Sequence, residues 1–204
     1  MGEITKVLKS AGVENNTLLI FTSDNGPWAY GNHAGKTPYR ESKATGFDGG
    51  TRSPCIIRYP GRIPAGTISK RLFYSIDLLP TIASLTGAAL PQHPIDGKDV
   101  WDLITAKPGA VNPHEYYPFT TGPAFEGVFS GDGRWKFHLP HEYRTLQEPG
   151  HNGAAGKYQS VSLEMSLFDM EADPLESRNV IAAYPDVAER LKAIAERHRK
   201  QFFN

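Results

Sequence analysis

Hydrophobic positions at both ends of the chain follow helical spacing. Over residues 2–11 the apolar side chains recur every three or four positions, and Gly12 ends the predicted helix. Over residues 185–202 the same spacing predicts an amphipathic helix. Its buried stripe is expected to consist of Val187, Leu191, Ile194, His198 and Phe202.

Two shorter helices are predicted in the middle of the chain. Residues 78–86 follow Asp77, a typical amino-terminal cap, and precede Gly87, a typical helix end. This helix is expected to turn its large aliphatic side chains inward, namely Leu78, Leu79, Ile82 and Leu85. Residues 98–106 are expected to form one further short helix.

The first half also contains two apolar runs with the character of strands. Residues 17–22 are apolar on successive positions, which favours a strand covered on both faces, and residues 54–59 predict another. A helix followed closely by a buried strand is typical of an open α/β sheet. Residues 23–50, between the strands, hold six glycines and two prolines without periodicity, so they predict a long functional loop.

The second half has a different pattern. Short aromatic-rich runs separated by turns predict a small antiparallel sheet, with strands at residues 115–121, 125–131, 134–139 and 166–170. The polar, glycine-rich residues 149–160 predict a mobile surface loop. The fold class is therefore α/β, with an α/β sheet domain over residues 1–111 and an antiparallel-sheet subdomain with a terminal helix over residues 112–204.

Composition narrows the possible partners. The 204 residues carry 22 lysines and arginines against 22 aspartates and glutamates, so no overall field favours nucleic acid or an acidic membrane surface. The apolar runs are too short to span a bilayer. Cys55 is the single cysteine, which excludes an internal disulfide and leaves the redox compartment undecided.

Candidate chemistry lies in the loop at residues 23–50. Asp24, Asn25 and Gly26 directly follow a predicted strand, where a ligand crevice opens in α/β sheets. Carboxylate and amide oxygens suit calcium or magnesium, although the same three residues are also typical of a plain turn. Lys43 lies among glycines and is either an anion contact or a solvated lysine. His33, Lys36 and Arg40 are read as solvated loop residues, with substrate contact as the alternative.

Five stretches in this order resemble the carboxy-terminal half of type I sulfatases. They are LLIFTSDNGP, SKATGFDGGTRSPCIIRYPGRIPAG, SIDLLPTIASLTGA, IDGKDVWDLI and LFDMEADPLESRNV. The resemblance covers nearly the whole chain. It implies the carboxy-terminal part of a sulfatase-type α/β domain, followed by the small antiparallel sheet with its helix.

The resemblance also implies roles for individual residues. Asp24 and Asn25 match the ligands of a divalent cation, usually calcium, with magnesium as the alternative. Lys43 matches the lysine that contacts the sulfate group. His138 matches a histidine near the substrate, with His141 as a rival, and for both the alternative is a residue held by a backbone hydrogen bond. Glu176, with Glu171 and Asp173, matches only a polar connection toward the terminal helix.

The resemblance further implies what the chain lacks. The family's nucleophile is a formylglycine made from the cysteine of a Cys-x-Pro-Ser-Arg motif, which this sequence does not contain; Cys55 is expected to be a small core residue. The chain alone is therefore expected to have little or no sulfatase activity, with its site completed by another segment. Partners are expected to be a sulfated small molecule or carbohydrate, together with self-association or a companion amino-terminal polypeptide. The family is often periplasmic, secreted or lysosomal, and no signal for any compartment is visible.

Two other functions remain open. A phosphoester or phosphonate hydrolase could be built on the same scaffold, although such relatives tend to carry histidine at the position of Asn25 and to bind transition metals. A carbohydrate-binding or assembly module could retain the fold without turnover.

Overall fold

The chain divides into two compact units, each described here by itself. The computed structural model describes residues 1–29, 36–152 and 154–203. Unit 1 consists of Met1–Ser23 with Pro54–His114, and unit 2 consists of Asp24–Ser53 with Glu115–Asn204. These units are defined by contacts within the chain. The assignment of domains to residues 1–111 and 112–204 stays a prediction.

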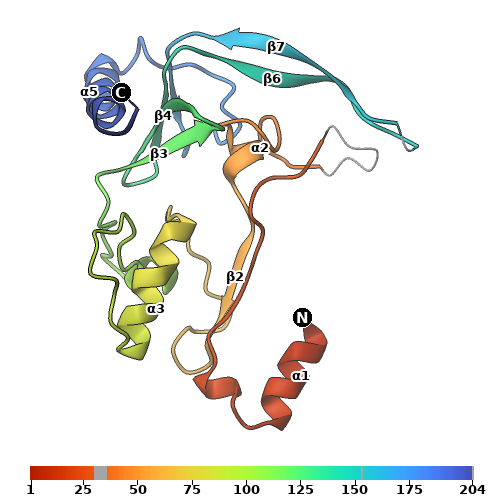
Figure 1. The fold of residues 1–204 in the computed structure, drawn as a ribbon, viewed down its shortest axis with the longest axis vertical. Coiled ribbons are helices and arrows are strands. Elements are labelled where there is room, and N and C mark those ends of the chain that lie inside the picture. The colour runs from red at the N-terminus through yellow and green to blue at the C-terminus, as the bar shows by residue number, and fades with distance from the viewer. Residues whose placement is uncertain (30–35, 153, 204) are drawn as a thin grey trace. The chain divides into compact units, whose positions relative to one another are not determined.

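Unit 1 combines short helices with one pair of strands (Figure 1). Strand β1 pairs antiparallel with β2, so that Ile20 lies opposite Ile57. In chain order the elements are α1 (Gly2–Ser10), the 3-10 helix η1 (Glu14–Asn16), β1 (Leu19–Thr22), β2 (Cys55–Arg58), the 3-10 helix η2 (Ser75–Asp77), α3 (Leu78–Thr86) and α4 (Trp101–Ile104). The predicted helices and strands are therefore present, with α4 shorter than expected.

The expected burial of unit 1 is wrong in three elements, β1, β2 and α3. No residue of β1 is fully buried, and Phe21 is exposed; Cys55 in β2 is exposed as well. Strand β1 is apolar, but within the described residues it pairs with β2 alone. Helix α3 buries Pro80, Thr81 and Ala83 and exposes Leu79 and Ile82.

The face of α3 is set by polar contacts that periodicity does not reveal. The Thr81 hydroxyl donates to the carbonyl of Asp77 and accepts the N–H of Val100, so threonine can be buried at this position. Asp77 occupies the cap position, but its carboxylate accepts the N–H groups of Tyr74 and Lys98 instead of capping the helix, and it contacts the ring of His114.

Unit 2 is built on the predicted antiparallel sheet. Its order is β3-β4-β5-β8, with β3 at Tyr116–Thr121, β4 at Ala124–Ser130, β5 at Trp135–His138 and β8 at Ser166–Asp169. Helix α5 (Pro185–Phe202) packs on this sheet (Figure 1) and buries Leu191, Ile194 and His198 as predicted. Ala188 and Ala195 complete the stripe, whereas Phe202 is exposed.

Three elements of unit 2 differ from the expectation from the sequence: the two strands of a hairpin and one short helix. Residues 141–163 contain a hairpin of β6 (His141–Glu148) and β7 (Lys157–Leu163), so residues 157–160 belong to a strand and not to a mobile loop. Helix α2 (Asp48–Thr51) forms the end of the glycine-rich segment. None of the described helices is both long and apolar enough to cross a membrane.

Candidate functional site

The turn that carries Asp24 and Asn25 is bonded to the segment that carries Lys43. Within unit 2, the N–H of Gly26 donates to the carbonyl of Gly50 over 2.8 Å, and the N–H of Lys43 donates to the carbonyl of Pro27 over 3.0 Å. A β-carbon at Gly26 would lie 1.8 Å from the carbonyl oxygen of Gly49, so this close approach requires glycine. The backbone therefore brings the two predicted parts of the site together.

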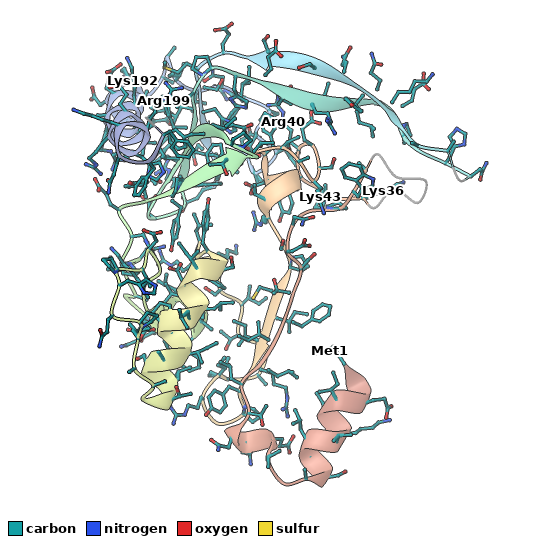
Figure 2. The ribbon with its side chains drawn as sticks, viewed as in Figure 1. Met1, Lys36, Arg40, Lys43, Lys192 and Arg199 are labelled. Carbon is teal, nitrogen blue, oxygen red and sulfur yellow. The ribbon has the colours of Figure 1, made fainter. Side chains whose placement is uncertain are left out.

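Lys43 lies on a tightly constrained turn. The neighbouring Ser42 and Thr45 are buried, and the Thr45 hydroxyl donates to the carbonyl of Ser42 over 2.9 Å. Glu41 and Ala44 have φ angles of 59° and 73°, in the left-handed region that L-residues rarely adopt. The Lys43 side chain is exposed (Figure 2) and makes no ion pair within the described ranges. Its ammonium is thus presented to solvent by a fixed backbone.

Asp24 and Asn25 supply oxygen atoms of the kind that calcium and magnesium prefer. Asp24 is exposed and Asn25 is half-buried. Calcium takes roughly six to eight oxygen ligands, so two neighbouring side chains can provide only part of its coordination. Across the described ranges, no group of three or more His, Cys, Asp or Glu side chains is arranged to enclose a metal ion. The two residues fit a share of an oxygen-rich cation site.

His138 is placed in the interior of unit 2. It is fully buried, stacks on Phe47 with ring centroids 5.0 Å apart, and has its Nε2 atom 3.4 Å from Oε1 of Glu176. Burial, aided by the positive charge of Lys136, holds the pKa of His138 well below its usual value, so the imidazole is neutral. Its role as a substrate contact stays a prediction.

His141, the rival of His138, lies closer to the surface. Its Nδ1 atom is 2.7 Å from the carbonyl oxygen of Leu139, and its Nε2 atom is 3.6 Å from Oε2 of Glu126. The Nε2 atom of His141 and the Oε2 atom of Glu126 are both buried and have no hydrogen-bond partner among the described residues.

Arg40 is not a solvated loop residue, and in this respect the expectation is wrong. Its guanidinium donates to the carbonyl of Glu176 over 2.6 Å and to the hydroxyl of Tyr143 over 2.9 Å. It also lies 4.0 Å from the centroid of the Phe47 ring. Lys36 is exposed as expected, and His33 lies outside the described residues.

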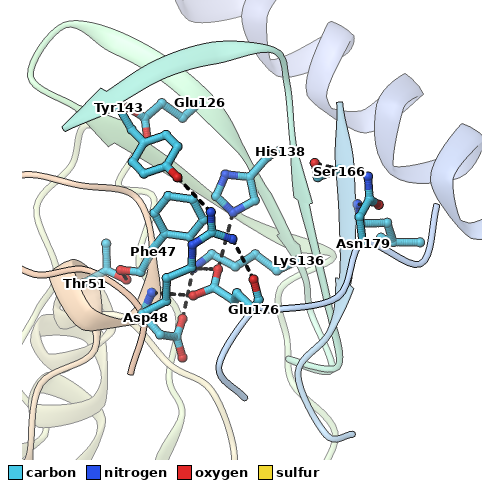
Figure 3. Close-up of polar contacts among 12 residues, drawn as sticks. Phe47, Asp48, Thr51, Glu126, Lys136, His138, Tyr143, Ser166, Glu176 and Asn179 are labelled. Carbon is cyan, nitrogen blue, oxygen red and sulfur yellow. Dashed lines mark hydrogen bonds and ion pairs between the residues drawn. The ribbon is translucent and has the colours of Figure 1, made fainter. Parts of the chain in front are cut away.

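Glu176 lies in the polar connection between β8 and α5, but its side chain is buried. Figure 3 shows its carboxylate beside the ammonium of Lys136, and both side chains are fully buried. Lys136 contacts Oε1 of Glu176 over 2.7 Å and Oδ1 of Asp48 over 3.0 Å. One feature of the sequence could have indicated these contacts: Lys136 lies between Trp135 and Phe137 in a predicted strand. A lysine buried in such a strand needs an acidic partner.

Comparison with known proteins identifies the class. The family described as Sulfatase matches residues 1–88. Arylsulfatase A of Bos taurus is 32% identical over 208 residues, covering 96% of this chain and 40% of the relative. Residues 1–88 thus match the sulfatase family, and nearly the whole chain is similar to part of an arylsulfatase.

The chain is also similar to a second curated sulfatase and to a sulfatase of known structure. An N-acetylgalactosamine-6-O-sulfatase of Bacteroides thetaiotaomicron is 30% identical, with 96% of this chain and 39% of the relative covered. The crystal structure of a sulfatase from Pseudoalteromonas sp. matches with a TM-score of 0.80 and 26% identity, covering all of this chain and 41% of that one. The chain thus spans about 40% of the length of the relatives it matches.

A phosphonate monoester hydrolase of Agrobacterium radiobacter shares the fold. It matches with a TM-score of 0.57 at 22% identity, over 98% of this chain and 38% of that one. At this identity the likeness concerns the fold alone.

Proposed function

We propose that the chain is the carboxy-terminal part of a sulfuric ester hydrolase. In this proposal residues 1–111 belong to the catalytic α/β domain and residues 112–204 form its small subdomain. Asp24 and Asn25 contribute to a divalent-cation site, for calcium or magnesium, and Lys43 contacts the sulfate group. The observation that carries the proposal is the pair of backbone hydrogen bonds between the two segments, from Gly26 to Gly50 and from Lys43 to Pro27.

The proposed roles follow from the chemistry of each side chain. A sulfate ester gains negative charge on its oxygens as the bond to the alcohol breaks, and fixed positive charge lowers the energy of that state. The Lys43 ammonium supplies such a charge from a constrained backbone, and its exposed side chain is accessible to a ligand. Asp24 and Asn25 would orient the cation, which supplies a second positive charge when bound.

The chain contains no Cys-x-Pro-Ser-Arg motif. We therefore propose that the nucleophile, a formylglycine, comes from another segment and that the chain alone has little or no sulfatase activity. Unit 1 exposes apolar side chains on each of its elements α1, β1 and β2, including Val7, Phe21 and Ile56. Apolar surface of this kind favours association, either with a second copy or with a companion polypeptide.

The proposed substrate is a sulfated carbohydrate or another sulfated small molecule. Support comes from the names of the relatives, which include an arylsulfatase and an N-acetylgalactosamine-6-O-sulfatase. A phosphoester or phosphonate hydrolase is the second candidate, because a phosphonate monoester hydrolase shares the fold. The amide of Asn25 favours the sulfatase, because an amide oxygen suits calcium better than a transition metal.

Calorimetry with calcium tests the proposed cation site. Calcium titrated into the chain is expected to bind weakly, and Asp24→Ala is expected to abolish the heat of binding. A sulfated monosaccharide should tighten calcium binding in the wild type but not in Lys43→Ala. Unchanged binding by Asp24→Ala would contradict the cation site, and a module that only binds carbohydrate would need no calcium.

A hydrolysis assay separates the two candidate reactions. The chain, combined with the segment that carries the nucleophile, is expected to cleave an aryl sulfate faster than the matching aryl phosphate. The opposite preference would favour the phosphoester hydrolase.

A further inference from the structure

A cluster of buried charged residues connects residues 40–50, which include Lys43, to the four-stranded sheet of unit 2. Its members are Lys136 on β5, Glu176 after β8, and Asp48 at the start of α2 (Figure 3). Asp48 and Glu176 are separated by 128 positions in sequence. None of the three has a role in the proposed chemistry.

The charged groups of the cluster contact one another directly. The Lys136 ammonium contacts Glu176 and Asp48 and also lies 4.7 Å from the centroid of the Phe129 ring. The second carboxylate oxygen of Glu176 accepts the backbone N–H of Asp48 over 2.7 Å. Glu176 therefore caps the first residue of α2 from a distant part of the chain.

Further hydrogen bonds link Glu176 to the residues on either side of Lys43. The carbonyl of Glu176 accepts from Arg40, and the carbonyl of Arg40 accepts the N–H of Gly49 over 2.8 Å. Gly49 lies beside Gly50, whose carbonyl accepts from Gly26 next to Asn25. Contacts of Glu176 thus reach both ends of the segment at residues 40–50, which includes Lys43.

The strained backbone beside Lys43 needs an external restraint. The left-handed φ angles of Glu41 and Ala44 are unfavourable for residues with a β-carbon and persist only where surrounding contacts impose them. A buried ion pair is a poor way to gain stability alone, because a well-packed apolar pair of similar volume stabilises a core as well or better. An ion pair that also holds a backbone N–H fixes one geometry, which an apolar pair does not.

We propose that Glu176 and Lys136 are positioning residues: their buried pair holds residues 40–50 against the sheet and so fixes the Lys43 ammonium relative to Asp24 and Asn25. The functional part of this inference rests on the proposed role of Lys43 as a sulfate contact. The mechanical part, the restraint of residues 40–50, does not depend on that role.

Amide hydrogen exchange of the isotopically labelled chain tests the restraint. In Glu176→Gln, the amides of Lys43, Asp48 and Gly49 are expected to exchange about tenfold or more faster, since a hydrogen bond to a buried charge is lost. The sheet amide of Leu139, which donates to Glu126, should change by less than about threefold. Glu115→Gln, which removes one partner of the exposed pair with Arg197, is the matched control and should leave all these amides unchanged.

Equal acceleration of loop and sheet amides in Glu176→Gln would overturn the proposal, because it would show a role in global stability only. Unchanged loop amides would overturn it as well. If Glu176→Gln does not fold, Glu176→Asp replaces it: the shorter side chain keeps the charge but withdraws the carboxylate from the Asp48 N–H. The same selective acceleration of the loop amides is then expected, and its absence contradicts the proposal.

Titration with inorganic sulfate in the presence of calcium, followed at the Lys43 amide, tests the link to function. Glu176→Gln is expected to bind sulfate about tenfold more weakly than the wild type, and Glu115→Gln equally well. Absence of sulfate binding by the wild type would count against the proposed function, while the exchange results would still decide the restraint. Equal affinity of Glu176→Gln and wild type would overturn the positioning role.

Discussion

The two units of the chain bury their apolar residues to different extents. Unit 2 has a continuous core between its four-stranded sheet and α5, including Phe137, Leu167 and Leu191. The core of unit 1 is a small cluster around Val100, Leu103 and Ile104. Apolar side chains on its α1, β1 and α3 remain exposed.

In unit 2 the apolar side chains of the sheet and of α5 cover one another, and the charged Lys136 is buried with its partners Asp48 and Glu176. In unit 1 the apolar pattern exceeds what the described residues cover. We infer that unit 2 is the more stable unit and that unit 1 is the one that gains from a partner.

The largest expected effect comes from removing matched leucines in the two units. Leu191→Ala in α5 should cost about 2–5 kcal/mol, because the side chain is fully buried. Leu79→Ala in α3 should cost less than about 0.5 kcal/mol, because that leucine is 53% exposed. Chemical denaturation measures both losses of unfolding free energy, and equal losses would contradict the difference in burial between the two units.

The pH dependence of unit 2 gives the next largest effect. Burial lowers the pKa of His138, so the folded chain keeps this residue neutral while the unfolded chain protonates it below about pH 6.5. The contribution of neutral His138 to the unfolding free energy is therefore fully present above about pH 6.5. It is lost as the pH falls below this value, by up to about 1.4 kcal/mol per pH unit. His138→Gln should show a shallower loss between pH 6.5 and 5 in denaturation experiments, and parallel slopes would contradict the buried neutral state.

Relief of backbone strain beside Lys43 should have a smaller effect of opposite sign. Ala44 is exposed and has a φ angle of 73°, which glycine adopts without the penalty of a β-carbon. Ala44→Gly is expected to stabilise the chain by about 0.5–1 kcal/mol in denaturant unfolding. A loss of stability would show that the turn is not strained.

The smallest effect on stability is expected on the exposed face of α1. Val7 is 66% exposed, so Val7→Lys should change the unfolding free energy by less than about 0.5 kcal/mol. If this apolar face takes part in association, the sedimentation coefficient at high protein concentration should fall in the variant. An unchanged sedimentation coefficient alongside an associating wild type would place the contact elsewhere.

Element positions were largely predictable from the sequence, whereas burial was not. The strands of the small sheet and helices α3 and α5 follow from local spacing and turn residues. The spacing predicts the wrong inward face for α3, because the helix is apolar on most sides and the contacts of Thr81 determine which face is buried. The spacing does not indicate the β6–β7 hairpin, because its strands are mostly polar, with β6 largely half-buried and β7 largely exposed.

The sequence identifies the candidate site residues, whose roles stay a prediction, but it does not indicate the contacts that hold them in place. Asp24, Asn25 and Lys43 carry chemistry that is visible in the sequence and in the family resemblance. Glu176 contacts Asp48 across 128 positions, and no local pattern reports such a contact. The sequence likewise predicts a solvated Arg40, because the partners of Arg40, Tyr143 and Glu176, lie far along the chain.

The central claim is that Asp24, Asn25 and Lys43 converge on one cation and oxyanion site. Paramagnetic broadening by manganese, added in place of calcium, tests it most directly. The claim predicts that the amides of Asn25 and Lys43 broaden together at low manganese concentrations and that both lose the effect in Asp24→Ala. Broadening of Asn25 with no effect at Lys43, or equal broadening in Asp24→Ala, would contradict it.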